Sequence, residues 1–481
     1  MSFAVVATCI IVLVILVALI AAEQPVWIAL AAAGGVGILL LDGMGVVSST
    51  FQDSPLGSVA KYSLLIVPMF ILMGVLARKA GIASDVFAIA SRLTRRIPGG
   101  LGVATILACG GFAAVTGSSV ATVATVGRLA VDEMVKRGYK PNSAAAIVAA
   151  GGTLGILIPP SIIIVIFASL VQASVGKLLL AGLIPGVITM AAYSIVVIVK
   201  ALRSPQLAVP AEASASVAVG ASGAGVRSAD SSTTTVVANG TLSKKTPDRN
   251  DSQDHVGFFK RHIAGVLIAL GLMVVVLGGM YSGLFTATES GAVAAALALV
   301  IMVVRRRKDG FKAVVRGVRD SAQEAGGTTA MIFALLVGGT IFGYFLIKSG
   351  LPTYITHQIV GLNLSTTAVV VAALLIMLVL GFFLEAYSIM VITIPLMWPM
   401  MVAMDVDPIW FGILAVKAIE IGMLTPPFGI NVFVAAKTHP SLTVEGIFRA
   451  VFPFVIAEVA VIALLIAFPG IVTWLPDTIR G

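Results

Sequence analysis

Long uninterrupted apolar runs are the feature that most constrains this chain. Residues 263–280 (IAGVLIALGLMVVVLGGM) contain no charged side chain, and comparable runs recur along the sequence. A helix needs about 20 such residues to cross a bilayer, whereas a membrane β-strand reads as about ten alternating residues. Only 11% of the residues are charged, against about 25% in soluble domains, and 59% are hydrophobic. The sequence therefore predicts an all-α polytopic membrane protein.

The candidate spans form two groups separated by a polar segment. The predicted spans are residues 4–22, 26–41, 63–80, 143–170, 178–199, 263–280, 291–304, 328–347, 410–436 and 451–474, and two further apolar stretches are residues 100–134 and 366–404. Residues 201–257 are rich in Ala, Ser, Thr and Gly, and this composition predicts a flexible linker because it cannot bury enough surface to fold. We divide the chain into scaffold helices (1–62), a first repeat (63–200), the linker (201–257), a second scaffold segment (258–327) and a second repeat (328–481).

Three short motifs occur twice in the same order. Residues 74–81 (GVLARKAG) resemble residues 343–350 (GYFLIKSG), GF at 111–112 recurs at 381–382, and residues 155–160 (GILIPP) resemble residues 422–427 (GMLTPP). The offsets are 269, 270 and 267 residues. Shared glycine and proline positions at a nearly constant offset favour a duplicated unit over chance matching of apolar residues.

The basic residues indicate how the two copies are oriented. The formal charge of +9 is spread over clusters between the spans, so it reports membrane topology and does not indicate a nucleic-acid partner. If these clusters face the cytoplasm, the span 63–80 runs inward and its copy 328–347 runs outward, so the repeats are inverted. Residues 100–134 then enter and leave on one side as a re-entrant hairpin, and residues 366–404 enter from the opposite side. The linker is expected to be cytoplasmic.

Polar breaks interrupt both hairpins and the spans that follow them. The hairpin breaks are TGSS (116–119) and EAYS (385–388), and the following spans break at Pro159–Pro160 and Pro426–Pro427. A proline pair frees carbonyl groups that lipid cannot satisfy, whereas the start of a half-helix suits an anion. Inverted repeats with such breaks are typical of secondary transporters. A single proline pair would favour a packing kink, but two copies at corresponding positions, each beside a polar hairpin break, favour a binding site.

Charged residues inside the spans need a partner or a water-lined location. Lys417 and Glu420 lie three residues apart and can form an ion pair; the alternative is a role in coupling or gating. Glu385, at the second break, is either an ion ligand or an N-terminal cap. We expect Glu458 to be structural or to face a membrane partner.

The sequence argues against an enzyme. The four histidines lie in the linker, at helix ends or in a loop, so an intramembrane hydrolase using Ser118 would lack a base within the membrane. The chain also lacks the GxxxxGK[ST] motif of nucleotide hydrolases, which leaves an ion gradient as the energy source.

Six stretches together carry a family resemblance. They are PMFILMG (68–74), TGSSVAT (116–122), KRGY (136–139), AAGGTLGILIPPS (149–161), ITIP (392–395) and EIGMLTPPFGIN (420–431). With these motifs the chain resembles the large membrane subunit of tripartite ATP-independent periplasmic (TRAP) transporters over nearly its whole length except the linker. The resemblance implies a sodium-driven elevator transporter in a bacterial inner membrane, with a small organic anion such as a C4-dicarboxylate or sialic acid as substrate.

The resemblance also implies partners and site residues. The partners are a periplasmic substrate-binding protein and a small four-helix membrane subunit; the alternative is a stand-alone sodium- or proton-coupled transporter of related inverted-repeat fold. The implied sodium ligands are Gly117, Ser118, Ser119, Gly152 and Thr153 in one site and Ala386, Tyr387, Ser388, Gly422, Met423 and Thr425 in the second. The implied substrate residues are Ser119, Pro160, Ser161, Ser388, Pro427 and Asn431. The linker is longer than such a subunit needs.

Overall fold

The computed structural model describes residues 3–203, 251–362 and 364–478, and the regular structure in these ranges is entirely helical. Among the described residues, eight helices are long and apolar enough to cross a membrane, or nine if the bent pair Pro141–Leu157 and Ile162–Val171 forms one span. The prediction of an all-α polytopic membrane protein is therefore confirmed. Most of the predicted linker falls on residues 204–250, which lie outside the described residues.

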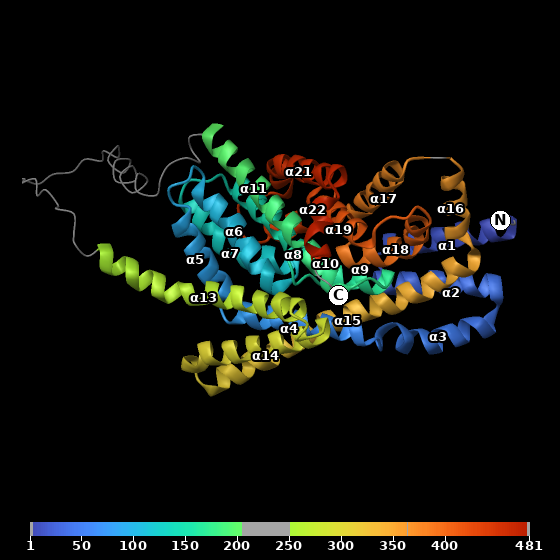
Figure 1. Ribbon diagram of the computed structural model, residues 1–481, viewed down its shortest axis with the longest axis horizontal. Coiled ribbons are helices and arrows are strands. Elements are labelled where there is room, and N and C mark those ends of the chain that lie inside the picture. Colours follow the sequence, from blue (N-terminus) through green and yellow to red (C-terminus); the bar gives the residue numbers. More distant parts are fainter. Residues whose placement is uncertain (1–2, 204–250, 363, 479–481) are drawn as a thin grey trace, which may run out of the picture.

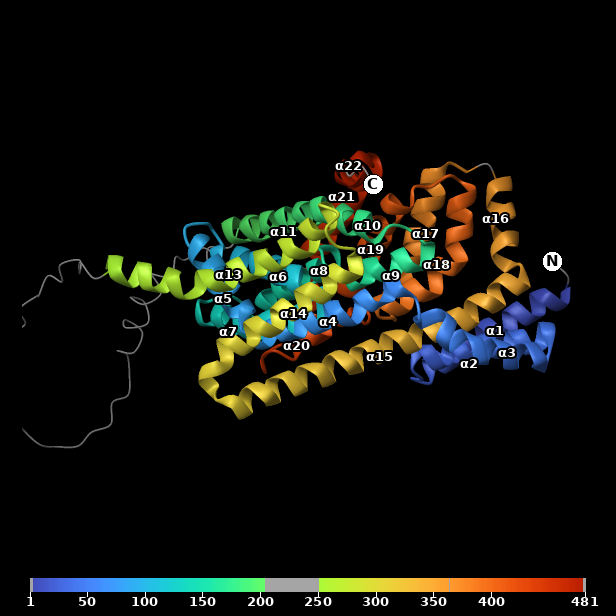
Figure 2. The same ribbon diagram turned by 60° about the horizontal axis from the view of Figure 1, so that its bottom comes forward.

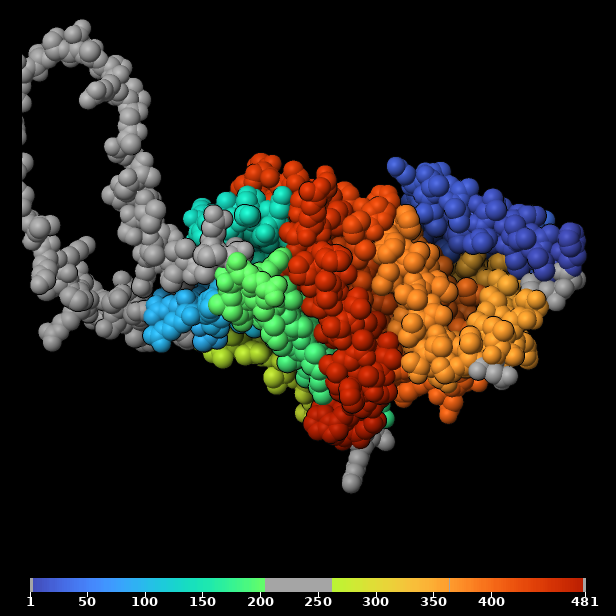
Figure 3. Space-filling model, turned by 90° about the horizontal axis from the view of Figure 1, so that it is seen from above, coloured from blue at the N-terminus to red at the C-terminus, as the bar shows by residue number. Residues whose placement is uncertain are grey.

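The helices form two layers in the view of Figure 1. The lower layer contains α2 (Val26–Asp42), α3 (Met44–Val59), α4 (Ile66–Lys79), α13 (Asp251–Tyr281), α14 (Ala287–Arg306) and α15 (Phe311–Ser349), and α1 (Phe3–Ala21) packs on α2. The upper layer contains α5 (Ile82–Leu93), α6 (Gly100–Thr116), α7 (Ser119–Lys136), α8 (Pro141–Leu157), α9 (Ile162–Val171), α10 (Val175–Ala181), α11 (Leu183–Arg203), α17 (Thr366–Gly381), α18 (Ala386–Ala403), α19 (Pro408–Leu424), α20 (Ile430–Ala436), α21 (Val444–Ala467) and α22 (Gly470–Asp477), while α16 (Leu351–Gly361) joins the layers at one edge. Seen from above, α11 in green lies beside the red C-terminal helices (Figure 3).

Helix α15 braces the molecule. Its 39 residues make it about 58 Å long, nearly twice the roughly 30 Å hydrocarbon core of a bilayer. Figure 2 shows α15 running beneath the upper layer along much of the molecule. It packs backbone to backbone on α2, since a Cβ on Gly338 would lie 2.4 Å from the Trp27 carbonyl oxygen and one on Gly34 would lie 2.8 Å from the Phe342 Cα. Small residues of this kind hold helices together in lipid, where van der Waals contact replaces the hydrophobic effect.

Both predicted hairpins are present as helix pairs. Helices α6 and α7 occupy the predicted range 100–134, and α17 and α18 occupy the range 366–404. The helix that follows each hairpin is broken: α8 and α9 meet at a bend of 40°, and a loop separates α19 from α20. Both Pro–Pro peptide bonds at these breaks are cis. The element order of the two halves thus corresponds, and the insertion of the hairpins from opposite sides stays a prediction.

Several helices differ from the predicted spans. Helices α3, α5 and α16 were not predicted, because they are too short or too polar to resemble spans. Helix α15 begins at Phe311 rather than at residue 328, because Lys, Arg, Asp, Gln and Glu interrupt the apolar residues of its first 17 positions, so that this part does not resemble a membrane span although it is helical. Helix α13 begins at Asp251, inside the predicted linker, in a segment that contains no proline.

Candidate functional site

The first hairpin tip is a sharp break between α6 and α7. Gly117 ends α6 with a positive φ of 59°, and a Cβ there would lie 2.4 Å from the Pro160 carbonyl oxygen. Both the conformation and the space therefore require glycine. Ser118 then caps α7, because its hydroxyl accepts a hydrogen bond from the Ala121 N–H at 3.4 Å. The tip thus lies directly against the break between α8 and α9.

Helix α8 packs on the backbone of this tip. A Cβ on Gly155 would lie 2.6 Å from the Ser118 carbonyl oxygen and 3.0 Å from the Ser119 nitrogen. A Cβ on Gly152 would lie 2.1 Å from the Val123 Cγ2 atom and 3.4 Å from the Ser119 carbonyl oxygen. The glycines of α8 therefore determine where the carbonyl groups of the tip lie.

A hydrogen bond joins the first tip to the break in the second repeat. Asn431, at the start of α20, donates from Nδ2 to the Ser119 Oγ at 2.6 Å and to the Ala149 carbonyl oxygen at 3.4 Å. The side-chain oxygen of Asn431 is buried and has no hydrogen-bond partner. The two halves of the chain therefore meet at the tip, and an unpaired oxygen lies beside the contact.

The second tip has a different polar composition. Glu385 occupies the N-cap position of α18, but its side chain makes no capping hydrogen bond, so the capping alternative is not observed. The Ser388 hydroxyl is buried and makes no hydrogen bond of normal geometry, with the Glu385 carboxyl group beside it. Across the gap, the Tyr387 side chain interacts with Ser118 of the first tip. The two tips are therefore neighbours in space.

A cavity of about 410 Å³ lies between the tips. The first tip contributes Ser118 and Ser119, and the second contributes Glu385, Ala386 and Tyr387. Helices α7 and α18 both begin at this cavity. Because a helix N-terminus carries unpaired N–H groups and a partial positive charge, the cavity presents two such groups of donors.

The sequence did not predict the wall that the lower layer contributes. Arg78 of α4 and Glu324, Thr328 and Met331 of α15 line the cavity, and Arg78 forms an ion pair with Glu324. In the sequence, Arg78 lies at the basic end of the predicted span 63–80 and indicates only its orientation, and Glu324 lies outside the predicted span 328–347. The partners lie 246 residues apart, so only their charges hinted at the contact.

The predicted site residues divide into four groups. Ser118, Ser119, Ala386, Tyr387 and Met423 line the cavity. Gly117, Gly152, Thr153, Pro160, Ser161, Ser388, Gly422 and Asn431 are buried and do not line it, whereas Pro427 is exposed. The half-buried Thr425 donates its hydroxyl to the Ile421 carbonyl oxygen at 2.6 Å. Their roles as ligands stay predictions.

The predicted ion pair inside α19 is confirmed. Lys417 Nζ lies 2.7 Å from the Glu420 Oε2, and both side chains are completely buried. Glu458 of α21 also pairs with Lys417, so its expected structural role has a specific partner. The sequence suggested one ion pair, and the structure has three charged groups together.

Known proteins share this architecture. The family described as "Tripartite ATP-independent periplasmic transporter, DctM component" matches residues 13–471. The chain is 31% identical to the isethionate TRAP transporter permease protein DctMQ of Oleidesulfovibrio alaskensis, over 92% of this chain but only 61% of that longer protein. It is 29% identical to the C4-dicarboxylate TRAP transporter large permease protein DctM of Vibrio cholerae, over 93% of this chain and 95% of that protein.

A solved structure shares the fold. The crystal structure of the Alcanivorax borkumensis YdaH transporter matches with a TM-score of 0.56 and 15% sequence identity, over 90% of each chain. The family and its named relatives are transporter components and permeases, not enzymes. The chain therefore belongs to the DctM component family of tripartite ATP-independent periplasmic transporters.

Proposed function

We propose that this chain is the sodium-coupled permease subunit of a TRAP transporter and that the cavity between the two tips binds a small organic anion. The observation that carries the proposal is the cavity itself, which both tips and the lower layer line together. The N-termini of α7 and α18 supply donors that suit carboxylate or sulfonate oxygens. The relatives named above are described as permeases for isethionate and for C4-dicarboxylates, which are small anions of this kind.

Sodium is proposed as the coupling ion because unpaired oxygen atoms lie near the tips. The Asn431 side-chain oxygen is buried without a hydrogen-bond partner, which costs free energy unless another group binds there, and the buried Ser388 hydroxyl has only the Glu385 carboxyl group beside it. Small hard cations take oxygen ligands, including hydroxyl and carbonyl groups. These two atoms therefore fit a sodium ion better than a softer metal ion.

Charge balance gives a physical reason for coupling. The cavity wall carries one cation, Arg78, and two carboxyl groups, Glu324 and Glu385, among the described residues. When all three are ionised, an anionic substrate entering alone meets a net negative charge. Sodium ions bound beside the tips offset that charge, so substrate and sodium each increase the affinity for the other.

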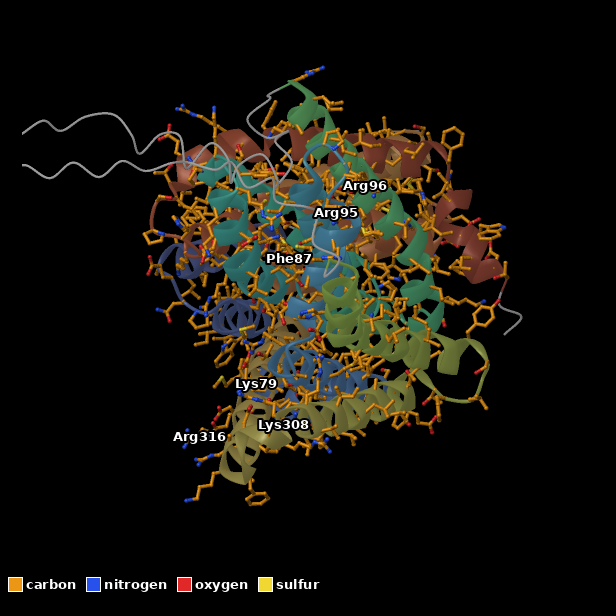
Figure 4. All side chains as sticks on the ribbon, turned by 90° about the vertical axis from the view of Figure 1, so that its left-hand side faces the viewer. Lys79, Phe87, Arg95, Arg96, Lys308 and Arg316 are labelled. Atoms are coloured by element: carbon orange, nitrogen blue, oxygen red, sulfur yellow. The ribbon has the colours of Figure 1, made fainter. Side chains whose placement is uncertain are left out.

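We propose an elevator movement in which the upper layer, with both tips, shifts against α15 and α2. We place the chain in a bacterial inner membrane, with the linker predicted at residues 201–257 on the cytoplasmic side. Basic residues at one end of the molecule support this orientation: Figure 4 shows Lys79, Arg95, Arg96, Lys308 and Arg316 at the end that faces the viewer. Lys and Arg collect on the cytoplasmic side of membrane proteins.

We also propose two partners, a small membrane subunit and a periplasmic substrate-binding protein. The match covers 61% of the length of the relative named DctMQ, so that relative contains a further segment outside the match. Uptake that proceeds in liposomes without either partner would instead favour a stand-alone transporter.

Uptake in proteoliposomes tests the sodium sites. We expect Ser118→Ala and Ser388→Ala each to raise the sodium concentration for half-maximal uptake about tenfold, which corresponds to about 1.4 kcal/mol. The matched control is Ser49→Ala, because Ser49 lies exposed on α3 and bonds only to the Val46 carbonyl oxygen among the described contacts. Sodium activation that is unchanged in both tip variants would contradict the proposed sites.

A further inference from the structure

A buried polar chain connects the two broken helices. Thr153 of α8 lies 3.2 Å from the Tyr193 hydroxyl of α11, and Tyr193 donates a hydrogen bond to Glu458 of α21. Glu458 pairs with Lys417 of α19, which also pairs with Glu420. Each of these five side chains is completely buried.

The stability of the fold does not by itself explain why these polar side chains are buried together. A fully buried ion pair loses so much hydration that apolar side chains of the same volume often serve equally well. The three charged groups and two hydroxyl groups therefore fix the relative positions of the helices more than they increase the free energy of unfolding. The directed hydrogen bonds allow α8, α11, α19 and α21 only one arrangement relative to each other.

The two ends of this row of polar side chains, Thr153 and Glu420, lie beside the two proposed sodium sites. Thr153 follows Gly152, which packs on the first tip. Glu420 lies about half a turn before Gly422, where a Cβ would lie 2.7 Å from the Gly381 Cα of α17. Helices α8 and α19 pack on each other, and α21 packs on both. A shift of either broken helix would therefore reach the other through Tyr193 and Glu458.

We propose that Tyr193 and Glu458 are positioning residues that hold the two broken helices in register and so couple the two sodium sites. This inference rests on the proposed sodium dependence. Neither residue lines the cavity, so both act through Thr153 and Lys417 rather than on the substrate.

Tyr193→Phe is the sharpest test, because it removes only the hydroxyl group that joins Thr153 to Glu458. The readout is the stabilisation of the purified protein by sodium chloride, measured by thermal unfolding against choline chloride at equal concentration. We expect the sodium concentration for half-maximal stabilisation to rise about fivefold, equivalent to about 1 kcal/mol, and the cooperativity of sodium activation of uptake to fall.

The control is Tyr139→Phe. The buried Tyr139 hydroxyl accepts a hydrogen bond from the Gly102 N–H at 3.3 Å and lies outside the chain of polar contacts. Both variants lose one hydroxyl group from a buried tyrosine, so a merely structural effect would lower the unfolding temperature of both without changing the response to sodium.

A double-mutant cycle separates the remaining outcomes. We expect Tyr193→Phe combined with Glu458→Gln to change the sodium affinity no more than the stronger single variant, because the residues act in series. Additive effects, or a normal sodium response in Tyr193→Phe, would overturn the inference. A wild-type protein that sodium neither stabilises nor activates would instead refute the proposed function on which it rests.

Discussion

The contact between α8 and the first tip allows a prediction whose size can be worked out from the structure. In Gly155→Ala, the new Cβ would lie 2.6 Å from the Ser118 carbonyl oxygen, and an ordinary contact begins at 3.4 Å. The tip must therefore move by about 0.8 Å, since the atoms in the way belong to the backbone and no rotamer change can move them. Overpacking of this kind costs about 1–3 kcal/mol in a well-packed core.

The consequence for sodium follows from the tolerance of metal sites. Ligand distances in a functional ion site hold within about 0.2 Å. A displacement of about 0.8 Å would therefore move the tip carbonyl groups out of coordination distance of the proposed sodium ion. We expect the sodium concentration for half-maximal uptake to rise at least tenfold (about 1.4 kcal/mol) in Gly155→Ala. The assay is uptake in proteoliposomes over a sodium series, with sodium-dependent thermal stabilisation as a second measurement.

Two further variants show whether the tip contact is responsible. Gly271→Ala makes the same change inside α13, where nothing lies within 4 Å of the new Cβ, and we expect no loss. Gly152→Ala meets the Val123 side chain at 2.1 Å, so Val123→Ala in the same chain should restore the sodium response. If Gly155→Ala folds and keeps the sodium affinity of the wild type, the reasoning about the tip is refuted.

Two other predictions concern the charged contacts. Arg78→Gln should raise the KM for the anion about tenfold with little change in Vmax, because it removes the cation of the cavity wall. The control is Arg137→Gln, which breaks the i,i+4 ion pair with Glu133 away from the cavity. An equal KM in both variants would contradict the role of Arg78. Asp85→Asn should lower the free energy of unfolding by about 2 kcal/mol, less than the roughly 3–5 kcal/mol for a fully buried pair, because its partners Arg305 and His262 keep 24% of their side-chain surface exposed. Thermal unfolding beside the exposed control Asp309→Asn measures this effect, and equal stability of the two variants would contradict it.

Local chemistry determined much of what the sequence could predict. The apolar runs require helices in a bilayer, because no water is present to satisfy an open backbone. Adjacent prolines and the Thr-Gly-Ser-Ser segment disfavour a continuous helix, so the breaks after α8 and α19 and the first tip could be predicted in place. The pair between Lys417 and Glu420 was equally predictable, because residues three apart share a helix face.

Tertiary structure alone decided which distant residues meet. Neither Arg78 and Glu324 nor Tyr193 and Glu458 show any local pattern, since 246 and 265 residues separate the partners. The length of α15 could not be predicted either, because its first half is helical but too polar to resemble a membrane span. The sequence by itself determined where the helices break. The packing of the two layers decided which side chains complete the cavity, because packing brings together residues that lie far apart in the sequence.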